Sequence, residues 1–404
     1  MNKKQIILSI CFATLLIFIF GIIMTHELKH GDFPPHINWA KEYNQIGYLN
    51  KIPHVLFAKL VVVVRALLPA NLLVWVSPLV KQVYDLKSFE ISTLLLMVSS
   101  YLLLSFVVYH RFLKKWEVDN TKQNVLTMVL TLTLLLLGPI FLFTYPDRMF
   151  LGYIAGNRYD SPTYILAKPF ILIMFISLID NFYSKWNWKQ VLIAVIAVVC
   201  ATLAKPNFTI SILPAIVIVA LINIKEFKKF NKLFLFFAIG VTSLVVLFGQ
   251  FLINYAGDRG DRIIVAPFKS ILYYVPNIPI EFFFIVCSLL FPILITIKYW
   301  SHLKKTLPFQ LAWVNIIISL GYSLLLAEQI NYPANNFWNG NMIGMFILFF
   351  VSIEFWGKDI ISKVKNKSRL FFSDYSLIIA LGLHLLCGII YYFATLANTG
   401  INVN

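Results

Sequence analysis

The sequence predicts an all-α protein that crosses a membrane about eleven times. Of its 404 residues, 59% are hydrophobic and only 13% are charged, whereas a soluble domain carries about 25% charged residues. Apolar runs of 18 or more residues recur along the chain, which is the pattern of transmembrane helices. We therefore expect a single transmembrane domain over residues 1–404, without a sizeable soluble domain.

The first apolar run, Ile6 to Met24, follows the basic start "MNKK". It lacks the small-residue cleavage site of a signal peptide, so we expect it to be a retained anchor. Each apolar run is followed by a polar or proline-bearing break. The predicted spans begin near residues 5, 89, 122, 163, 190, 207, 233, 277, 308, 338 and 375.

Basic residues gather in alternate breaks, which predicts the orientation of the chain. The breaks "HRFLKKW", "SKWNWK", "KEFKKFNK", "KYWSHLKK" and "KDIISKVKNKSR" fall on the same side as the N-terminus. That side holds 20 Lys/Arg and 7 Asp/Glu, against 14 and 11 elsewhere. By the positive-inside rule this side, including the N-terminus, is cytoplasmic. The same dispersal explains the net charge of +16 without a nucleic-acid partner.

The segment from 52 to 80 is apolar enough to suggest a further span. A single crossing here would place all later basic clusters outside, and it would bury Lys59 and Arg65 in hydrocarbon. We expect interfacial or re-entrant helices instead. The first external region then runs over residues 26–88 as a structured loop. The four cysteines lie inside apolar runs, which argues against disulfides.

The start of this loop, "HGDFPPHINWAKEY", carries Asp32 and His36 on one helical face. Asp32 precedes Pro34 and Pro35, so one interpretation is a helix cap. The alternative is a general base held at the membrane surface. His36 could tune Asp32, hold a phosphate or face water.

Two further outer breaks offer basic residues for an anion. In "NRYDSPTY", Asp160 or Ser161 before Pro162 is a helix start, while Asn157 and Arg158 are not explained by capping and could hold an anion. In "LAKPNF", Lys205 lies in a tight turn at headgroup depth. It could snorkel or bind a lipid phosphate as a point charge.

The last two outer breaks are rich in arginine and asparagine. "GDRGDR" is either a solvated loop or a phosphate grip by Arg259 and Arg262. "AEQINYPANNFWNGN" places Glu328, Asn335 and Asn336 among aromatic residues. These residue types bind and stack on sugars, although an interfacial aromatic belt has the same composition.

The chain shows no Walker A loop, Gly-rich dinucleotide fingerprint, HExxH or GxSxG motif. It also shows no pairing of similar halves with matching broken helices, which disfavours a secondary transporter. Within the predicted spans, few polar residues stand out beyond Lys168 and His384.

Together these features resemble the GT-C superfamily of integral-membrane glycosyltransferases. "GDFPPHINWA" looks like the acid-bearing start of that family's first external loop, with Asp32 in the place of the acid, and "IPHVLFAKL" looks like its later His-Pro-type helix in reversed order. "LAKPNFTISILPA" is similar to a Lys-Pro turn of bacterial branches, matching Lys205. "AEQINYPANNFW" resembles a late acid-to-Asn-Phe motif, matching Glu328 and Asn336.

The resemblance implies a transferase that uses a polyprenyl-phosphate-linked sugar as donor, with inversion, in a bacterial cell (inner) membrane. Asp32 would be the catalytic base. The substrate-binding residues would be His36, Asn157, Arg158, Lys205, Arg259, Arg262, Glu328, Asn335 and Asn336. The acceptor would be an extracytoplasmic glycan or lipid-linked glycan, and the active site would face outside.

Many members of that family carry a second acid close to the catalytic one. Here the next acid after Asp32 is Glu42, ten residues further on, so a divalent metal or other cofactor is not supported. Two alternative functions are a transporter or flippase of lipid-linked sugars and a polymerase of lipid-linked glycans. The donor sugar, the acceptor, the linkage and the oligomeric state cannot be read from the sequence.

Overall fold

The computed structural model describes residues 3–47, 55–67, 87–118, 120–141, 152–255, 262–275, 277–366, 369 and 371–397. Over these ranges the chain is a bundle of helices with one two-stranded ribbon. The helices of the first half are α1 (Lys3–Glu27), α2 (Phe33–Ile46), α3 (Val55–Leu67), α5 (Ser88–Trp116), α6 (Thr121–Leu136), α7 (Pro162–Asn181), α8 (Trp188–Ala204) and α9 (Asn207–Ile222).

The second half continues the bundle with η2 (Ile224–Lys229), the π-helical η3 (Phe234–Val241) and α10 (Thr242–Tyr255). Next come α11 (Lys269–Leu272), α12 (Ile278–Ser288), α13 (Leu290–Leu303), α14 (Leu307–Leu325), η4 (Tyr332–Ala334), α15 (Trp338–Lys365) and α16 (Phe372–Leu396). The strands β1 (Ile263–Val265) and β2 (Leu326–Glu328) pair antiparallel, with Ile263 opposite Glu328.

The predicted class, a helical multi-pass membrane protein, agrees with the structure. In the part of the chain that is described, seven helices are long and apolar enough to cross a membrane, or eight if α12 and α13 form one bent span. Each of the eleven predicted spans coincides with a helix. However, α6, α8 and α9 have 16, 17 and 16 residues, and a crossing needs about 20. The count of eleven crossings therefore stays a prediction.

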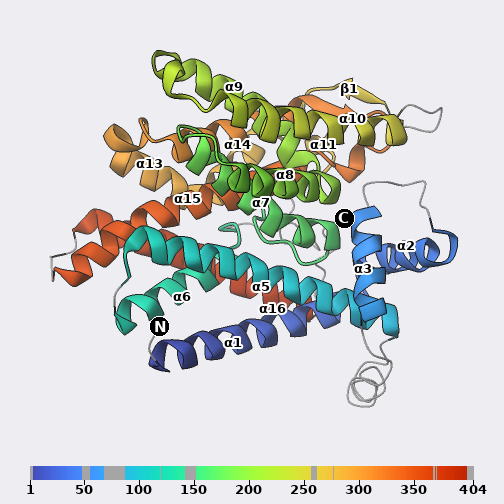
Figure 1. The fold of residues 1–404 in the computed structure, drawn as a ribbon, viewed down its shortest axis with the longest axis horizontal. Coiled ribbons are helices and arrows are strands. Elements are labelled where there is room, and N and C mark those ends of the chain that lie inside the picture. Colours follow the sequence, from blue (N-terminus) through green and yellow to red (C-terminus); the bar gives the residue numbers. More distant parts are fainter. Residues whose placement is uncertain are drawn as a thin grey trace.

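The bundle has two distinct ends (Figure 1). The N-terminus and the α15–α16 connection lie at the left in that view, and α2, α3 and β1 lie at the right. We call these the N-terminal end and the ribbon end. The central helix is α15, in which 89% of the most apolar 18-residue stretch is buried inside the molecule. In α1 only 17% of the corresponding stretch is buried. Helix α1 therefore borders the bundle, and α15 forms its core.

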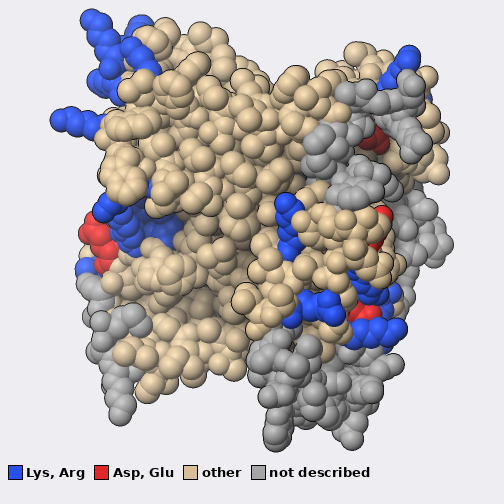
Figure 2. Space-filling view, turned by 45° about the vertical axis from the view of Figure 1, so that its right-hand side comes forward, with Lys and Arg blue, Asp and Glu red and all other residues tan. Residues whose placement is uncertain are grey.

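Charged side chains gather in patches on the surface of the molecule. In Figure 2, most of the visible face carries neither Lys, Arg, Asp nor Glu, and the coloured atoms cluster toward its left and right sides. Many large apolar side chains are exposed, such as Phe18, Ile193 and Phe248. An apolar surface of this kind is stable in hydrocarbon rather than in water.

The predicted helices of the 26–88 loop are present in part. Helix α3 runs across the direction of α5 in Figure 1 and packs against α2. Its two basic residues contact aromatic rings, Lys59 above Tyr43 at 5.9 Å and Arg65 above Phe89 at 4.4 Å. The rest of the 52–80 segment lies outside the described residues. With 13 residues, α3 is too short to span a bilayer.

The helix α16 approaches the end of α6 at a glycine. A Cβ atom on Gly388 would lie 1.7 Å from the carbonyl oxygen of Leu136, so no larger residue fits there. The His384 imidazole lies 2.7 Å from the Gly138 carbonyl oxygen. The four cysteines are free thiols, as the sequence predicted.

Candidate functional site

Asp32 occupies the N-cap position of α2, but it does not act as a side-chain cap. Its carboxylate makes no capping hydrogen bond, even though Pro34 and Pro35 begin the helix as predicted. The Asp32 side chain is 46% exposed, and its Oδ2 lies 3.9 Å from Nη2 of Arg158. The capping interpretation therefore does not explain Asp32, and the carboxylate remains available for chemistry.

Gly31 allows Asp32 to lie against a segment distant in sequence. Its φ of +56° is in the left-handed region that favours glycine, and a Cβ there would lie 2.9 Å from Cβ of Asp160. The next amide, that of Asp32, donates to the Asp160 carbonyl oxygen at 3.1 Å. The end of the first span is thus fixed to the loop that precedes α7.

That loop places Arg158 between two carboxylates. Arg158 donates to both oxygens of Asp160, Nε to Oδ1 at 2.5 Å and Nη2 to Oδ2 at 2.7 Å. Burial opposes the charge of Arg158, but the Asp160 carboxylate outweighs it and raises the pKa above its usual value. The guanidinium is therefore charged and largely neutralised by Asp160. This limits the role predicted for Arg158 as an anion ligand.

His36 is buried, so the interpretation that it faces water is wrong. Its Nδ1 lies 2.5 Å from the Asp32 carbonyl oxygen, and its ring packs edge-on to Trp39 and Phe57. Burial lowers the pKa of His36 to about 4, so the imidazole is neutral near pH 7 and Nδ1–H donates to the carbonyl. His36 therefore connects α2 to α3 and fixes the backbone of Asp32.

Lys205 lies in the predicted tight turn between α8 and α9. Its backbone is extended and Pro206 follows it at the start of α9. Burial, followed by the positive charge of Arg158, lowers the pKa of Lys205 to about 8, and Asp32 and Asp160 oppose this shift. The charges of Asp32, Arg158 and Asp160 therefore act on Lys205. Its ammonium group has no hydrogen bond or ion pair within the described ranges.

Lys205 also lines a cavity of about 450 Å³, which we call the Lys205 cavity. The cavity lies where α8, α9 and α10 meet the ribbon and the start of α15. Its lining residues are Thr163, Ala204, Lys205, Pro206, Asn207, Ile210, Leu247, Gln250, Phe251, Ile263, Glu328, Asn336, Phe337 and Asn339. The same cavity is thus lined by three residues predicted from two separate motifs: Lys205, Glu328 and Asn336.

The β1–β2 ribbon joins the two breaks that follow α10 and α14, both predicted to lie outside. The Gln329 amide donates to the Arg262 carbonyl oxygen at 2.8 Å, which extends the ladder by one bond. The Arg262 side chain is exposed and does not line the Lys205 cavity. Arg259, the other arginine of the predicted phosphate grip, lies outside the described residues.

Asn336 holds the Glu328 carboxylate in the Lys205 cavity. Its Nδ2 donates to Oε1 at 3.1 Å and to Oε2 at 2.9 Å. The Asn336 carbonyl oxygen accepts from Nδ2 of Asn207 at 2.9 Å, which connects this turn to the Lys205 turn. Asn335 has φ +46° and ends η4, and asparagine tolerates this left-handed conformation. The turn geometry therefore accounts for Asn335.

Asn157 does not reach the Lys205 cavity. Its amide donates to the carbonyl oxygens of Leu134 and Leu137 at 3.0 and 2.9 Å, and its Oδ1 accepts from Lys168 at 2.7 Å. The Lys168 ammonium also lies over the rings of Tyr164 and Phe346. These contacts give Asn157 a structural role inside the bundle, and its predicted role in substrate binding has no support from its position.

Sequence reasoning missed three residues that the structure places in this region. Asp160 was interpreted as a helix start, although the Arg-x-Asp spacing in "NRYD" could have indicated the pair with Arg158. Gln250 and Asn339 line the Lys205 cavity, and within the described part of the chain Gln250 Oε1 and Asn339 Oδ1 are buried without a hydrogen-bond partner. For Gln250, the available signal was a glutamine inside the predicted apolar span that begins near residue 233.

In the described part of the chain, no three His, Cys, Asp or Glu side chains are grouped so that they could hold a metal ion. Comparisons with protein families, with characterised proteins and with solved structures found no match for the chain.

Proposed function

We propose that the chain is a membrane glycosyltransferase that moves a sugar from a polyprenyl-phosphate donor to an extracytoplasmic glycan or lipid-linked glycan. One observation carries the proposal. Asp32, whose carboxylate makes no helix-capping hydrogen bond, acts electrostatically on Lys205. The Lys205 ammonium has no ion pair within the described residues, and it lines a cavity with Glu328 and Asn336. A base, a phosphate ligand and a cavity that carries some polar side chains are what this transfer requires.

In the proposed reaction, Asp32 accepts the proton of an acceptor hydroxyl. The hydroxyl oxygen forms the new bond to the anomeric carbon while the bond from that carbon to the phosphate oxygen breaks. Lys205 stabilises the phosphate leaving group. Arg158 is held in place by its hydrogen bonds to Asp160. Its Nη2 lies 3.9 Å from Oδ2 of Asp32 and orients that carboxylate. Attack from the face opposite the leaving group inverts the anomeric centre.

The membrane arrangement is part of the same proposal. The eleven helical segments cross the bilayer, the N-terminal end is cytoplasmic, and α2 and α3 lie at the outer surface of a bacterial cell membrane. The lysine-rich breaks support this orientation. The ribbon end, with Asp32 and the Lys205 cavity, would then receive a donor from the outer leaflet.

Asp32→Asn tests the proposal directly. The substitution preserves size and removes the proton acceptor, and a positioned base contributes about 10²- to 10⁴-fold in rate. The purified variant should fold, bind donor and lose transfer of radiolabelled sugar by that factor. The matched control is Glu42→Gln, an exposed acid on the same helix. An Asp32→Asn protein that keeps a tenth of wild-type transfer would refute the role of Asp32.

A transporter of lipid-linked sugars is a second candidate, and one observation favours it. Helices α12 and α13 meet at a 69° bend, and Glu281 in α12 is fully buried, with no hydrogen-bond partner for either oxygen among the residues that the structure describes. Broken helices and buried acids mark ion sites in transporters. Glu281→Gln in proteoliposomes separates the two candidates: loss of lipid-linked sugar translocation with intact sugar transfer to acceptor would favour transport as a distinct activity.

A further inference from the structure

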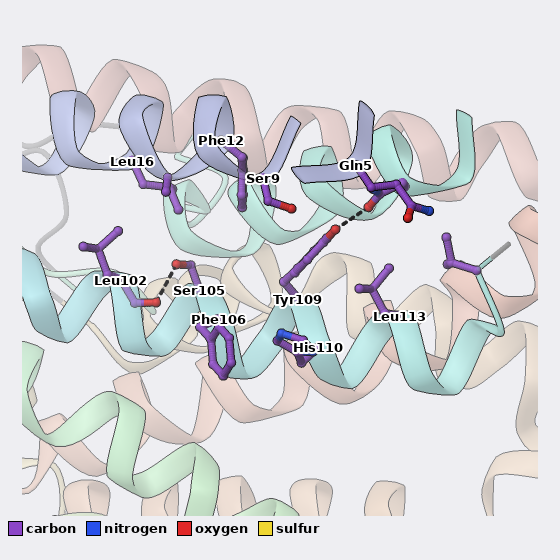
Figure 3. Close-up of a pocket in the computed structure, with 13 residues that line it drawn as sticks. Gln5, Ser9, Phe12, Leu16, Leu102, Ser105, Phe106, Tyr109, His110 and Leu113 are labelled. Atoms are coloured by element: carbon purple, nitrogen blue, oxygen red, sulfur yellow. Dashed lines mark hydrogen bonds between the residues drawn. The ribbon is translucent and has the colours of Figure 1, made fainter. Parts of the chain in front are cut away.

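A second cavity, far from Asp32, separates the N-terminal half of α1 from α5 (Figure 3). It has a volume of about 680 Å³, and we call it the α1–α5 groove. Its lining residues are Gln5, Ser9, Phe12, Ala13, Leu16, Leu102, Ser105, Phe106, Tyr109, His110, Leu113, Val118 and Asn124. The proposed transfer reaction does not use any of them.

The groove exists because α1 and α5 touch at one level and diverge toward the N-terminus. The Phe20 and Tyr101 rings stack with centroids 3.9 Å apart, whereas the Phe12 and Tyr109 centroids are 6.1 Å apart. Small side chains, Ser9 on α1 and Ser105 on α5, leave the space open between them. Figure 3 shows Ser9, Phe12 and Tyr109 pointing into the gap between the two helices.

The groove opens onto an apolar surface. Phe106 on α5, which lines the groove, is 59% exposed, and Ile10 in the same part of α1 is 61% exposed. Both helices meet the length and composition of membrane spans. The medium in contact with the opening is therefore the hydrocarbon of the bilayer.

The length of the groove matches a single leaflet. From Gln5 to Leu16 the helix rises about 16 Å at about 1.5 Å per residue, and the hydrocarbon core is about 30 Å thick. The groove therefore begins near the end of α1 that carries the N-terminus and stops near the bilayer centre. One set of acyl chains has this reach.

The end of the groove nearest the N-terminus is polar, and its other end is apolar. The Tyr109 hydroxyl donates to Oδ1 of Asn124, and His110 lies beside it. The next turn of α5 adds the exposed cation Lys114, one turn beyond His110. Leu16 and Leu102 form the opposite end. This order, from a cation through hydrogen-bonding groups to hydrocarbon, is the order of a phospholipid from phosphate through ester to acyl chain.

We propose that the α1–α5 groove holds one diacyl phospholipid of the leaflet nearest the N-terminus. Its acyl chain fills the space between α1 and α5, and its phosphate lies near Lys114. The lipid braces α1 against the bundle. Since α1 ends at Glu27, five residues before Asp32, this brace also supports the segment that carries the carboxylate.

Photocrosslinking to native lipid tests the proposal on the full-length protein. The photoreactive amino acid p-benzoylphenylalanine is placed at Phe12, in the groove, or at Phe18, which is 66% exposed on α1 outside it. Each protein is extracted in detergent, washed extensively and irradiated, and adducts are identified by mass spectrometry. We expect a phospholipid adduct at position 12 that is at least tenfold more abundant than at position 18, where loosely held lipid is washed away.

Filling the groove provides a second measurement. Ala13→Trp should reduce the position-12 adduct at least tenfold, and Thr14→Trp, one residue along on the exposed side of α1, should leave it unchanged. Equal adducts at positions 12 and 18 would overturn the proposal, as would a polyprenyl adduct or a crosslink between two copies of the chain. Because the comparison of positions 12 and 18 needs no filled variant, it decides the question even if Ala13→Trp misfolds. None of these readouts depends on sugar transfer.

Discussion

The two ends of the helical bundle use their charges in opposite ways. At the N-terminal end, Arg111 donates to Asp180 at 2.6 Å and to Glu354 at 2.8 Å, which joins α5, α7 and α15. At the ribbon end, Asp32 has its nearest described cation at 3.9 Å, and Lys205 has no ion pair within the described ranges.

A second ion cluster repeats the pattern of the N-terminal end. Asp374 on α16 is fully buried and accepts from both Lys298 of α13 and Lys363 of α15. These charges are saturated by partners that belong to different helices, so they hold the bundle together. At the ribbon end, Arg158 and Asp160 pair with each other, whereas Asp32 and Lys205 have no such close partner within the described ranges. Lys205 lines a cavity, where its charge can act on a ligand. The comparison teaches that pairing, rather than charge itself, distinguishes the ions that hold the bundle together from those proposed to act on a ligand.

The largest expected effect is on stability, at the N-terminal end. Arg111→Met leaves the Glu354 carboxylate, with a side chain 15% exposed, without its cation. Removing one partner of a buried pair costs about 3–5 kcal/mol. Thermal unfolding of the detergent-solubilised protein should show this loss, while transfer per folded molecule stays the same. The control is Lys229→Met, whose pair with Glu226 is exposed. An unchanged melting temperature for Arg111→Met would break the comparison.

The matching substitution at the ribbon end should affect binding and spare stability. Lys205→Gln should remove the proposed charged hydrogen bond to the donor phosphate, worth about 1.5–3 kcal/mol, or about 10- to 150-fold in KM. Its melting temperature should not fall, because no ion pair is lost. Steady-state transfer at varied donor concentration measures the effect. Wild-type KM would restore the snorkelling interpretation of Lys205.

The pH dependence should identify the Lys205 charge. Its pKa of about 8 means that the ammonium is present below that pH and is lost above it. The KM for donor should therefore rise about tenfold from about pH 7 to about pH 9, since the charged fraction falls tenfold for each unit above the pKa. Lys205→Arg, which stays charged, should flatten this rise. A rise that persists in Lys205→Arg would assign the titration to another group.

The smallest effect should come from the Glu328–Asn336 contact. Asn336→Ala frees the Glu328 carboxylate from two hydrogen bonds at an exposed position, worth about 1 kcal/mol. The KM for one substrate should rise about fivefold without a change in the melting temperature. The control is Gln329→Ala, next to Glu328 but outside the cavity lining. Equal effects of the two substitutions would exclude a specific role for Asn336.

Much of the fold could be predicted from the sequence. All eleven predicted spans coincide with helices, because the length and apolarity of a run are local properties that suffice for a helix in hydrocarbon. Three of these helices have only 16 or 17 residues, which the predicted starting positions of the spans did not reveal. The candidate site was predicted less completely. Lys205, Glu328 and Asn336 meet in one cavity as their motifs suggested, whereas Asn157 points into the bundle.

By itself, the sequence determined that this is a helical multi-pass membrane protein, and it singled out Asp32 and Lys205 as charges in the outer breaks. Tertiary structure alone decided which charges remain unpaired. Arg158 is neutralised by Asp160, His36 is buried against α3, and Gln250 reaches the Lys205 cavity from α10. The physical reason is that hydrophobic periodicity is set by neighbours along the chain, whereas ion pairing and burial depend on side chains brought together by packing from positions far apart in sequence.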